Sequence, residues 1–106
     1  IPMQINLTTR HGSIPESMEE YARTKAERLT KYFDRIESTN LIFDQTKSEH
    51  EVEAIICVEH SEDIVAHASG EDLRATIDQC IDRAVRQVTD HKSKLRDDKH
   101  HGPTSG

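Results

Sequence analysis

Apolar residues in the first third of the chain recur at intervals of three and four positions, which is the period of an α-helix. They are Met18, Tyr21, Ala22, Ala26, Leu29, Tyr32, Phe33 and Ile36. At about 100° per residue these side chains form one apolar face, which a folded chain buries against another layer. Ser13 and Glu16 have the spacing of a capping box, and Pro15 suits the first helical turn. The pattern predicts an amphipathic helix over residues 15–36.

Outside this helix, apolar residues alternate with polar ones at the period of a β-strand. The alternation predicts four strands: QINLTTRH at residues 4–11, LIFDQTK at 41–47, EVEAIICVEH at 51–60 and IVAHAS at 64–69. A second amphipathic pattern begins at about Glu71 and ends at about Leu95, with Ser69 or Asp72 as its candidate N-cap. The order of elements is therefore strand, helix, three strands, helix.

This order predicts an α+β fold with two layers, β-α-β-β-β-α, in which both helices pack on one face of a four-stranded sheet. A chain of 106 residues is long enough for one such core, so we expect a single domain over residues 3–96. The last residues, 97–106 with the sequence DDKHHGPTSG, are polar and lack periodicity. We expect them to form a disordered tail.

Positive charge is concentrated in two segments, although the chain has a formal net charge of −6. Residues 23–35 contain five basic and two acidic residues, and residues 83–96 contain five basic residues and one acidic residue. Salt screens charges over about 8 Å at physiological ionic strength, so a partner responds to the local patch rather than to the net charge. The two basic segments are therefore candidates for binding a polyanion.

On the first predicted helix, basic residues form a ridge beside the apolar face. The spacing of Arg28, Lys31 and Arg35 puts them on one flank of the helix. Lys25 lies within the apolar arc, where its stem can cover core residues while its ammonium group reaches solvent or a phosphate.

The second predicted helix carries a similar ridge. Arg83, Arg86 and Lys94 share one flank, whereas Lys92 and Arg96 point elsewhere. If the two helices lie side by side, the two ridges can border a common surface suited to a nucleic-acid backbone. The sequence does not show which flanks of the helices face each other.

The basic ridges also have a simpler interpretation, since charged residues on a helix can merely be solvated. Residues 37–63 contain eight acidic residues and one lysine. Glu51, Glu53 and Glu59 alternate along the third predicted strand, so the sheet face away from the helices should be acidic and wet. Such a face can repel phosphate, or it can serve solubility and protect the sheet edges. It also leaves open a second function, a regulatory module that binds a basic protein partner through the acidic sheet face.

Catalysis and metal binding have little support. No GxSxG, HExxH, P-loop or GxGxxG motif occurs, and we expect His60 and His67 to be structural or solvent-facing. Cys57 and Cys80 lie in apolar runs without CxxC spacing, which favours buried free thiols and a reducing, cytoplasmic compartment. His91 lies between the second ridge and the apolar face, where it either helps to hold phosphates or covers the core. We expect a non-enzymatic protein without a cofactor, a metal or a small-molecule substrate.

The apolar runs are too short for a membrane protein. None approaches the roughly 18 residues that span a bilayer, and no charged and then apolar leader opens the chain. We therefore expect a soluble protein that is not exported and has no membrane partner.

Three separated strings, which follow an opening MQINLT, carry a family resemblance: KYFDRI at residues 31–36, EDLRATID at 71–78 and RAVRQVTDHKSKL at 83–95. Together they resemble the ribosome hibernation promoting factor and ribosome-associated inhibitor family of bacteria. The resemblance covers residues 3–96, and it is specific because it joins these motifs to the predicted order of elements. It implies a fold similar to double-stranded-RNA-binding domains.

The resemblance also implies a function. Family members lie in the channel between the head and the body of the small ribosomal subunit, contact ribosomal RNA, and overlap the places of messenger RNA and transfer RNA. A protein of this kind inhibits translation and preserves idle ribosomes in stationary or stressed cells. The implied partners are the small ribosomal subunit and ribosomal RNA, and we expect a monomer that needs no cofactor.

Carried over by position, the family's basic contacts fall on Lys25, Arg28, Arg83, Arg86, His91, Lys92 and Lys94. With Lys31 and Arg35 from the first ridge, these residues form the predicted RNA-binding site. Asp90 stands where a lysine is common in the family, which weakens one phosphate contact, and Arg74 replaces a usual aromatic residue, which argues against stacking there. The chain is also more acidic than the strongly basic relatives. Longer members append a C-terminal dimerisation domain that pairs ribosomes, so the chain resembles a short form or the N-terminal domain of a long form.

Overall fold

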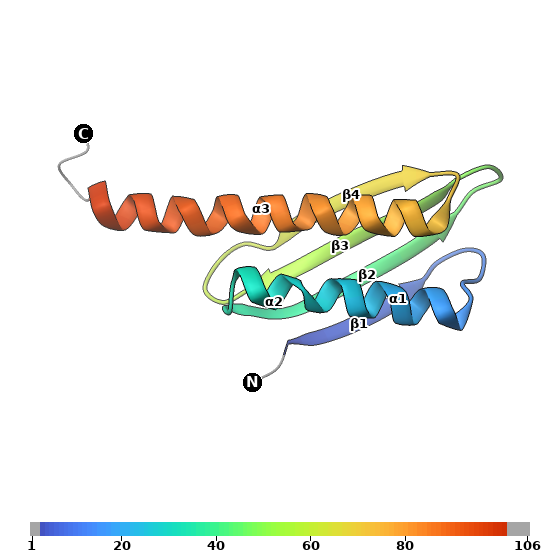
Figure 1. The fold of residues 1–106 in the computed structure, drawn as a ribbon, viewed down its shortest axis with the longest axis horizontal. Coiled ribbons are helices and arrows are strands. Elements are labelled where there is room, and N and C mark those ends of the chain that lie inside the picture. The colour runs from blue at the N-terminus through green and yellow to red at the C-terminus, as the bar shows by residue number, and fades with distance from the viewer. Residues whose placement is uncertain (1–2, 102–106) are drawn as a thin grey trace.

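The computed structural model describes residues 3–101, with side chains described as far as residue 94. Its elements follow the order β1 (Gln4–Thr9), α1 (Glu16–Glu27), α2 (Leu29–Tyr32), β2 (Ile36–Gln45), β3 (His50–Val58), β4 (Ile64–Gly70) and α3 (Leu73–His101). The helical segments α1 and α2 run end to end, and α3 lies beside them and runs in the same direction (Figure 1). The predicted order of strands and helices is confirmed.

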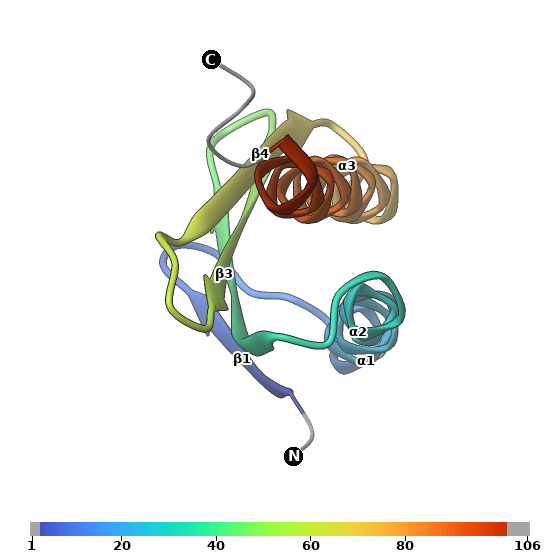
Figure 2. The ribbon, with the colours of Figure 1, turned by 90° about the vertical axis from the view of Figure 1, so that its left-hand side faces the viewer.

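The four strands form one mixed sheet in the order β1-β2-β3-β4. β1 pairs with β2 in parallel, which requires the helical crossover between them, and the other two pairs are antiparallel. The register aligns Leu7, Leu41, Ala54 and Ala66 across the sheet. The helices all cover the same face of the sheet, and the other face is open (Figure 2). The predicted two-layer α+β fold is therefore confirmed.

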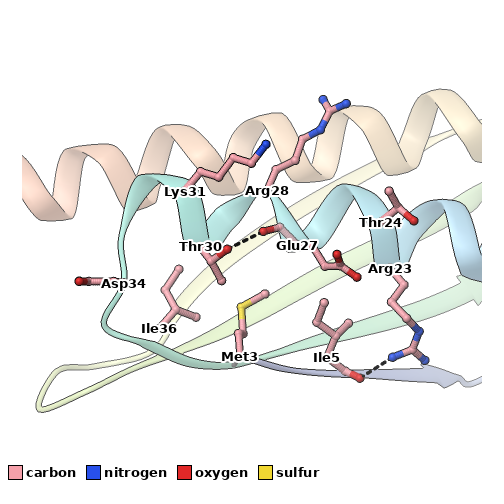
Figure 3. Close-up of a pocket in the computed structure, with 10 residues that line it drawn as sticks. All are labelled: Met3, Ile5, Arg23, Thr24, Glu27, Arg28, Thr30, Lys31, Asp34 and Ile36. Atoms are coloured by element: carbon pink, nitrogen blue, oxygen red, sulfur yellow. Dashed lines mark hydrogen bonds between the residues drawn. The ribbon is translucent and has the colours of Figure 1, made fainter. Parts of the chain in front are cut away.

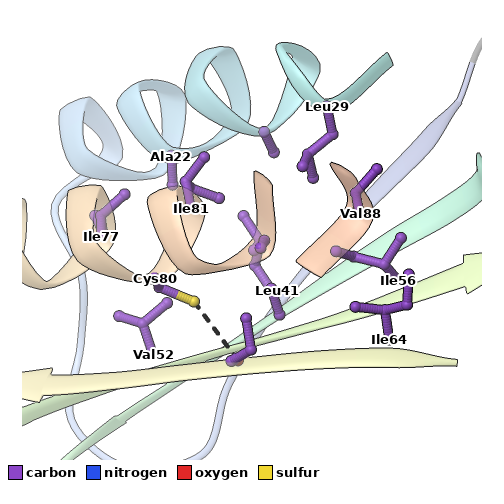
Figure 4. Packing of buried hydrophobic residues seen from close by; sticks show 14 of the residues in the cluster. Ala22, Leu29, Leu41, Val52, Ile56, Ile64, Ile77, Cys80, Ile81 and Val88 are labelled. Carbon is purple, nitrogen blue, oxygen red and sulfur yellow. Dashed lines mark hydrogen bonds between the residues drawn. The ribbon is translucent and has the colours of Figure 1, made fainter. Parts of the chain in front are cut away.

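The core lies between the helices and the covered face of the sheet (Figure 4). β3 contributes Val52, Ala54, Ile56 and Val58, and α3 contributes Ile77, Cys80, Ile81, Ala84 and Val88. These are the faces that the sequence periodicities predict. On α1, the buried residues Ala22 and Ala26 are small, which lets this helix approach α3 closely. Each fully buried leucine or isoleucine stabilises the fold by about 1.5–3 kcal/mol, so this core holds both helices in fixed positions on the sheet.

The two cysteines differ in their surroundings. Cys80 is buried; its Sγ lies 3.7 Å from the carbonyl oxygen of Ala66, and burial raises the pKa of its thiol to about 12. Cys57 is half-buried and faces the open side of the sheet. Both thiols are free, but the predicted burial is confirmed for Cys80 alone.

The first helix begins without the predicted capping box. Pro15 is its N-cap residue, and its carbonyl oxygen accepts hydrogen bonds from the N–H groups of Met18 at 2.9 Å and Glu19 at 3.1 Å. No side chain caps this end of the helix. A cap at Ser13 requires helical backbone at residue 14, and a following proline disfavours that conformation. The helix therefore starts at Glu16, after the proline.

The first helical region also ends earlier than predicted, at Tyr32 rather than at residue 36. Phe33 is extended, with φ −158° and ψ 116°, and Ile36 already pairs with Val58 as the first residue of β2. Phe33 and Ile36 are buried, as the helical spacing predicts. Burial alone does not distinguish a helix from a strand. The spacing of the apolar residues therefore predicts a helix that extends too far along the chain.

A break at Arg28 separates α1 from α2. Beside it, the hydroxyl of Thr30 donates a hydrogen bond to the carbonyl oxygen of Glu27 at 2.8 Å. A threonine hydroxyl in this position competes with the backbone donors of the helix. The break leaves both segments on the same side of the sheet, so the basic residues that follow it stay in the helical layer.

Asp72 caps α3, because its Oδ2 accepts a hydrogen bond from the N–H of Ala75 at 2.9 Å. This confirms one of the two predicted caps. The other, Ser69, belongs to β4.

At its other end, α3 continues to His101 instead of ending at Leu95. The structure thus places residues 97–101, predicted as part of a disordered tail, in a helix, whereas residues 102–106 lie outside the described residues. The physical reason is that the sequence has no glycine or proline between residue 73 and residue 101. None of the helices in the described part of the chain combines the length and the apolar character needed to span a membrane.

Candidate nucleic-acid interface

Arg83 projects from α3 toward the free edge of β4, on the side away from α1 and α2. Its Nη1 donates a hydrogen bond to the carbonyl oxygen of His67 at 2.6 Å, and Gln87 Nε2 donates one to that of Val65 at 2.8 Å. β4 is an edge strand, so these bonds satisfy acceptors that no neighbouring strand reaches. Lys94 is exposed about three turns beyond Arg83 on the same flank. We call the line of Arg83, Gln87 and Lys94 the outer flank of α3.

The opposite flank of α3 faces α1 and α2. There Lys92 Nζ donates a hydrogen bond to the carbonyl oxygen of Tyr32 at 3.3 Å. Near the start of α3, the guanidinium carbon of Arg74 lies 4.7 Å from the centre of the Tyr21 ring. We call the line along which the helices meet the seam; its polar members are Tyr21, Lys25, Arg74, Asp78 and Lys92.

Within the seam, Asp78 joins α3 to α1. Its Oδ1 accepts a hydrogen bond of 2.5 Å from the Tyr21 hydroxyl and lies 3.3 Å from Lys25 Nζ. Although partial burial acts to raise it, the pKa of the Asp78 carboxyl is lowered by these hydrogen bonds from Tyr21 and Lys25. The pKa of Arg74 is raised, first by its hydrogen bond with Tyr21. The Asp78 carboxyl and the Arg74 guanidinium are therefore both ionised at neutral pH.

Arg28 and Lys31 continue the basic ridge of the first helical region. Arg28 lies one turn after Lys25, so it borders the seam, and Lys31 follows at the next turn of the chain. Both side chains are exposed. Among the side chains that the structure describes, no ion pair within 4.0 Å involves Arg28, Lys31 or Arg86. These cations are therefore available to an external anion.

The predicted common surface between the two ridges does not form as expected. Arg28 borders the seam, but Arg83 lies on the outer flank, so the two predicted ridges do not face each other. The cations of α3 that face α1 and α2 are Lys92 and Arg74. The sequence predicts Lys92 to lie off the ridge, and it gives no indication that Arg74 belongs to the site. The spacing of residues 74, 78, 85 and 92 predicts that they lie on one flank of α3. The sequence does not show, however, on which side of α3 the first helix lies.

Three further predicted contacts lie in different surroundings. Arg86 is exposed on α3. Arg35 is exposed in the connection between α2 and β2, where its carbonyl oxygen accepts a hydrogen bond from the N–H of Glu59 at 3.0 Å. His91 packs its ring against Phe33, with ring centres 5.7 Å apart and planes at 67°. Its Nε2 is buried without a partner among the described residues. Of the two alternatives for His91, the structure supports the covering of the core.

A groove of about 810 Å³ lies on the other side of Arg28 and Lys31, between α1–α2 and the edge strand β1 (Figure 3). Its lining combines apolar and charged side chains: Met3, Ile5, Ile36, Thr24, Thr30, Arg23, Arg28, Lys31, Glu27 and Asp34. Arg23 crosses its end, where Nη1 donates a hydrogen bond to the carbonyl oxygen of Ile5 at 2.9 Å. Its basic and acidic residues nearly balance, so the groove adds little net charge to the helical layer.

The open face of the sheet is acidic where β3 begins, and the third predicted acid, Glu59, is exposed just beyond the end of β3. Glu51 and Glu53 lie on it as predicted, but Ile55 and Cys57 continue the same face of β3. Val65, opposite Ile55 in the register, is 47% exposed. The prediction of a wet acidic face is therefore confirmed where β3 begins. Farther along the strand it is wrong, because the surface there is partly apolar.

His60 and His67 are exposed to solvent, as predicted, and so is His11. His67 Nε2 lies 3.7 Å from Glu51 Oε1, and His60 Nε2 lies 3.4 Å from Glu59 Oε1. His11 Nδ1 lies 2.9 Å from Asp44 Oδ1, and this hydrogen bond is the main cause that lowers the pKa of the Asp44 carboxyl. Within residues 3–94, no group of three or more histidine, cysteine or acidic side chains could hold a metal ion.

Family comparison identifies the relatives of this fold. A family model described as Sigma 54 modulation protein / S30EA ribosomal protein matches residues 5–96. The chain belongs to this family. Membership confirms the resemblance drawn from the sequence strings, and with it the expectation of a non-enzymatic protein.

Curated relatives match nearly the whole described chain. A ribosome hibernation promoting factor from Escherichia coli (strain K12) is 38% identical over 94 residues, which cover 89% of this chain and 98% of that protein. One from Azotobacter vinelandii is 35% identical over 92 residues, which cover 87% of this chain and 85% of that protein.

Two solved structures share the fold. A ribosomal subunit interface protein from Coxiella burnetii has a TM-score of 0.79 at 25% identity and covers 86% of this chain and 99% of its own. The N-terminal domain of Protein Y from Thermus thermophilus has a TM-score of 0.74 at 24% identity and covers 84% of this chain and 99% of its own. Both support the two-layer arrangement of helices and sheet.

Proposed function

We propose that the chain is a ribosome hibernation factor that acts in the cytoplasm as a monomer. It binds the small ribosomal subunit and its RNA, occupies the messenger RNA and transfer RNA channel, and inhibits translation in stressed or stationary cells. Relatives named ribosome hibernation promoting factor, at 38% and 35% identity, support association with ribosomes. The observation that supports the RNA-binding surface is that Arg28, Lys31 and Arg86 are exposed on the helical layer without an acidic partner among the described side chains.

Cations held on rigid helices suit the phosphate backbone of RNA. Each cation that neutralises a phosphate releases a condensed counterion, so affinity is expected to fall steeply with salt. The common core fixes the helices on the sheet, so the cations keep their spacing when they meet the RNA. Binding of this kind responds to shape and charge more than to base sequence. A rigid domain bound in the channel would block it by occupancy, without making or breaking a bond.

The proposed contacts fall into two groups, according to whether the side chain already holds a partner within the protein. Those that are exposed without a hydrogen bond or ion pair among the described side chains are Arg28, Lys31, Arg35, Arg86 and Lys94. Those that hold a protein partner are Lys25, Arg83 and Lys92. The second group must share or exchange its partner for a phosphate, so each of its members is expected to contribute less. His91 keeps its ring against Phe33 and is left out of the proposed surface.

Cosedimentation with purified small subunits at two salt concentrations tests the proposal. Arg28→Glu combined with Arg86→Glu should weaken binding by on the order of 100-fold at low salt, because two attractions become repulsions. The matched control is Arg10→Glu combined with Lys47→Glu, which reverses two exposed charges outside the helices and should bind like the wild type. Equal binding by the helical variant and the wild type at both salts, with unchanged melting temperatures, would refute this surface.

Competition tests where the protein binds. Transfer RNA bound at the decoding site of the small subunit should displace the protein, because both would occupy the same channel. Retention of the protein on subunits saturated with transfer RNA would argue for a different site.

A second candidate function uses the open face of the sheet to bind a basic protein partner. It is supported by Val65, which is 47% exposed beside the half-buried Ile55, and by the neighbouring carboxylates of Glu51 and Glu53. The same competition separates the two functions, since transfer RNA would leave a complex through the sheet face intact. Glu51→Lys combined with Glu53→Lys should abolish such a complex and leave RNA-dependent binding unchanged.

A further inference from the structure

A carboxylate stands among the cations of the seam. Asp78 is held from α1 by the Tyr21 hydroxyl at 2.5 Å and by Lys25 Nζ at 3.3 Å, both through Oδ1. On its own helix, Arg74 lies over the same tyrosine ring. The groups that face Asp78 are thus one hydroxyl and two cations, and its negative charge lies where the basic helices meet.

Lys25 is the cation that this arrangement neutralises. Its side chain is 18% exposed, whereas that of Asp78 is 37% exposed. A polyanion that approaches this part of the seam therefore meets the carboxylate at least as readily as the ammonium group. Arg28, one turn farther along α1, has no acidic partner among the described side chains, so the two neighbouring cations of one ridge differ in their availability.

We propose that Asp78 competes with RNA phosphate for Lys25 and so limits the affinity of the helical layer for RNA. The inference rests on the proposed function, because it requires RNA to approach this layer. A phosphate that binds Lys25 must either displace Asp78 or bind beside its negative charge.

The charge state of the cluster supports this competition at neutral pH. Partial burial acts to raise the pKa of Asp78, but the hydrogen bonds from Tyr21 and Lys25 outweigh it and the pKa is lowered. The carboxylate is therefore ionised throughout the physiological range. A moderate fall in pH therefore does not release Lys25 from its ion pair with Asp78.

A purely structural role for this cluster predicts the opposite effect on binding. If Asp78 only fastens α3 to α1, its removal loosens the helical layer, and RNA binding weakens or stays the same. If Asp78 competes with phosphate, its removal releases one cation, and binding tightens although the domain loses stability. Affinity and melting temperature then change in opposite directions, which separates the two roles.

The experiment compares Asp78→Asn with the wild type by titration against small subunits at about 50 and 200 mM salt. We expect binding to tighten on the order of three-fold at the lower salt, and the slope of log K against log salt to steepen by about 0.7–0.9, as for one added phosphate contact. Glu53→Gln removes the same charge from the open sheet face and is the matched control, with unchanged binding expected. Tyr21→Phe removes the hydroxyl but no charge, and it should lower the melting temperature without tightening the complex.

Affinity of a folded Asp78→Asn variant at or below that of the wild type would overturn the proposal. If this variant does not fold, Lys25→Gln combined with Asp78→Asn replaces the ion pair by two neutral amides. Competition for Lys25 cannot act once Lys25 is absent, so the proposal requires this double variant to bind like Lys25→Gln alone. Clearly tighter binding by the double variant would overturn it, because Asp78 would then repel RNA without competing for Lys25.

Failure of this inference is distinguishable from failure of the proposed function. Loss of binding by Arg28→Glu combined with Arg86→Glu, with no change in Asp78→Asn, would refute only the competition. If neither the Arg28→Glu and Arg86→Glu double variant nor Asp78→Asn changes binding, both the competition and the proposed function are refuted.

Discussion

The helical layer and the open face of the sheet carry opposite charges, and they differ in how much of that charge is compensated within the face. On the helical layer, Arg28 and Arg86 have no acidic partner among the described side chains. On the open face, Asp44 holds a hydrogen bond to His11 and Glu51 lies near His67. The sign and the number of charges on a face therefore do not by themselves identify a binding surface. The helical layer is the better candidate for binding a polyanion because Arg28 and Arg86 are not paired with a carboxylate, although Lys25 is paired with Asp78.

The largest difference between the two faces should appear in stability. Leu29 is fully buried beneath the helical layer, whereas Val65 on the open face is 47% exposed. Leu29→Ala should lower the free energy of unfolding by about 2–5 kcal/mol, because it removes buried methyl groups and leaves a cavity. Val65→Ala should lower it by less than about 1 kcal/mol. Urea unfolding measures both, and equal losses would contradict the assignment of the core to the helical side.

The next effect concerns the arginines that reach over the two sheet edges. Arg23 donates to Ile5 on β1, and Arg83 donates to His67 on β4. Each substitution to glutamine should lower the free energy of unfolding by about 1 kcal/mol, the net contribution of one such hydrogen bond. The two variants should differ in small-subunit affinity, since Arg83 alone belongs to the proposed surface. Equal affinities in cosedimentation would show that Arg83 stabilises the sheet edge but does not contribute to binding of the small subunit.

The smallest effect is the pH and salt dependence of two carboxylates, one on each face. Asp78 and Asp44 both have lowered pKa values, so each stabilises the fold above the unfolded pKa of about 3.9, and this stability is lost as the pH falls through the folded pKa. The melting temperatures of Asp78→Asn and Asp44→Asn should therefore lie below that of the wild type at pH 7 and approach it in strong acid.

Salt should separate these two carboxylates. The partner of Asp44, His11, has a side chain that is 78% exposed, whereas the partner of Asp78, Lys25, is 18% exposed. High salt should therefore screen the Asp44 interaction more completely than the pair of Asp78 and Lys25. Thermal melts at low and high salt would measure this, and a larger screening effect at Asp78 would contradict the burial of the seam.

Much of the fold is predictable from periodicity, because each layer buries one face. The alternation of Val52, Ala54, Ile56 and Val58 identifies β3, and the spacing of Ile77, Ile81, Ala84 and Val88 identifies α3. The end of the first helical region was not predictable in the same way. Phe33 and Ile36 are buried in extended backbone, and a helix would bury them equally well.

The candidate site was predictable in its residue types but not in its arrangement. Basic spacing identified Arg28 and Arg86 as exposed cations. It could not show that Arg83 faces the β4 edge while Arg74 and Lys92 face the first helix. These relations depend on the position of α1 beside α3, which is set by packing between residues far apart in sequence.

Lysine acetylation of the protein bound to the small subunit would report which face of the domain the subunit covers. Lys31 and Lys94 belong to the helical layer, and Lys47 lies in the turn between β2 and β3; all three are exposed in the free protein. We expect Lys31 and Lys94 to lose their reactivity in the complex while Lys47 keeps it. Protection of Lys47, with Lys31 and Lys94 still reactive, would contradict this expectation.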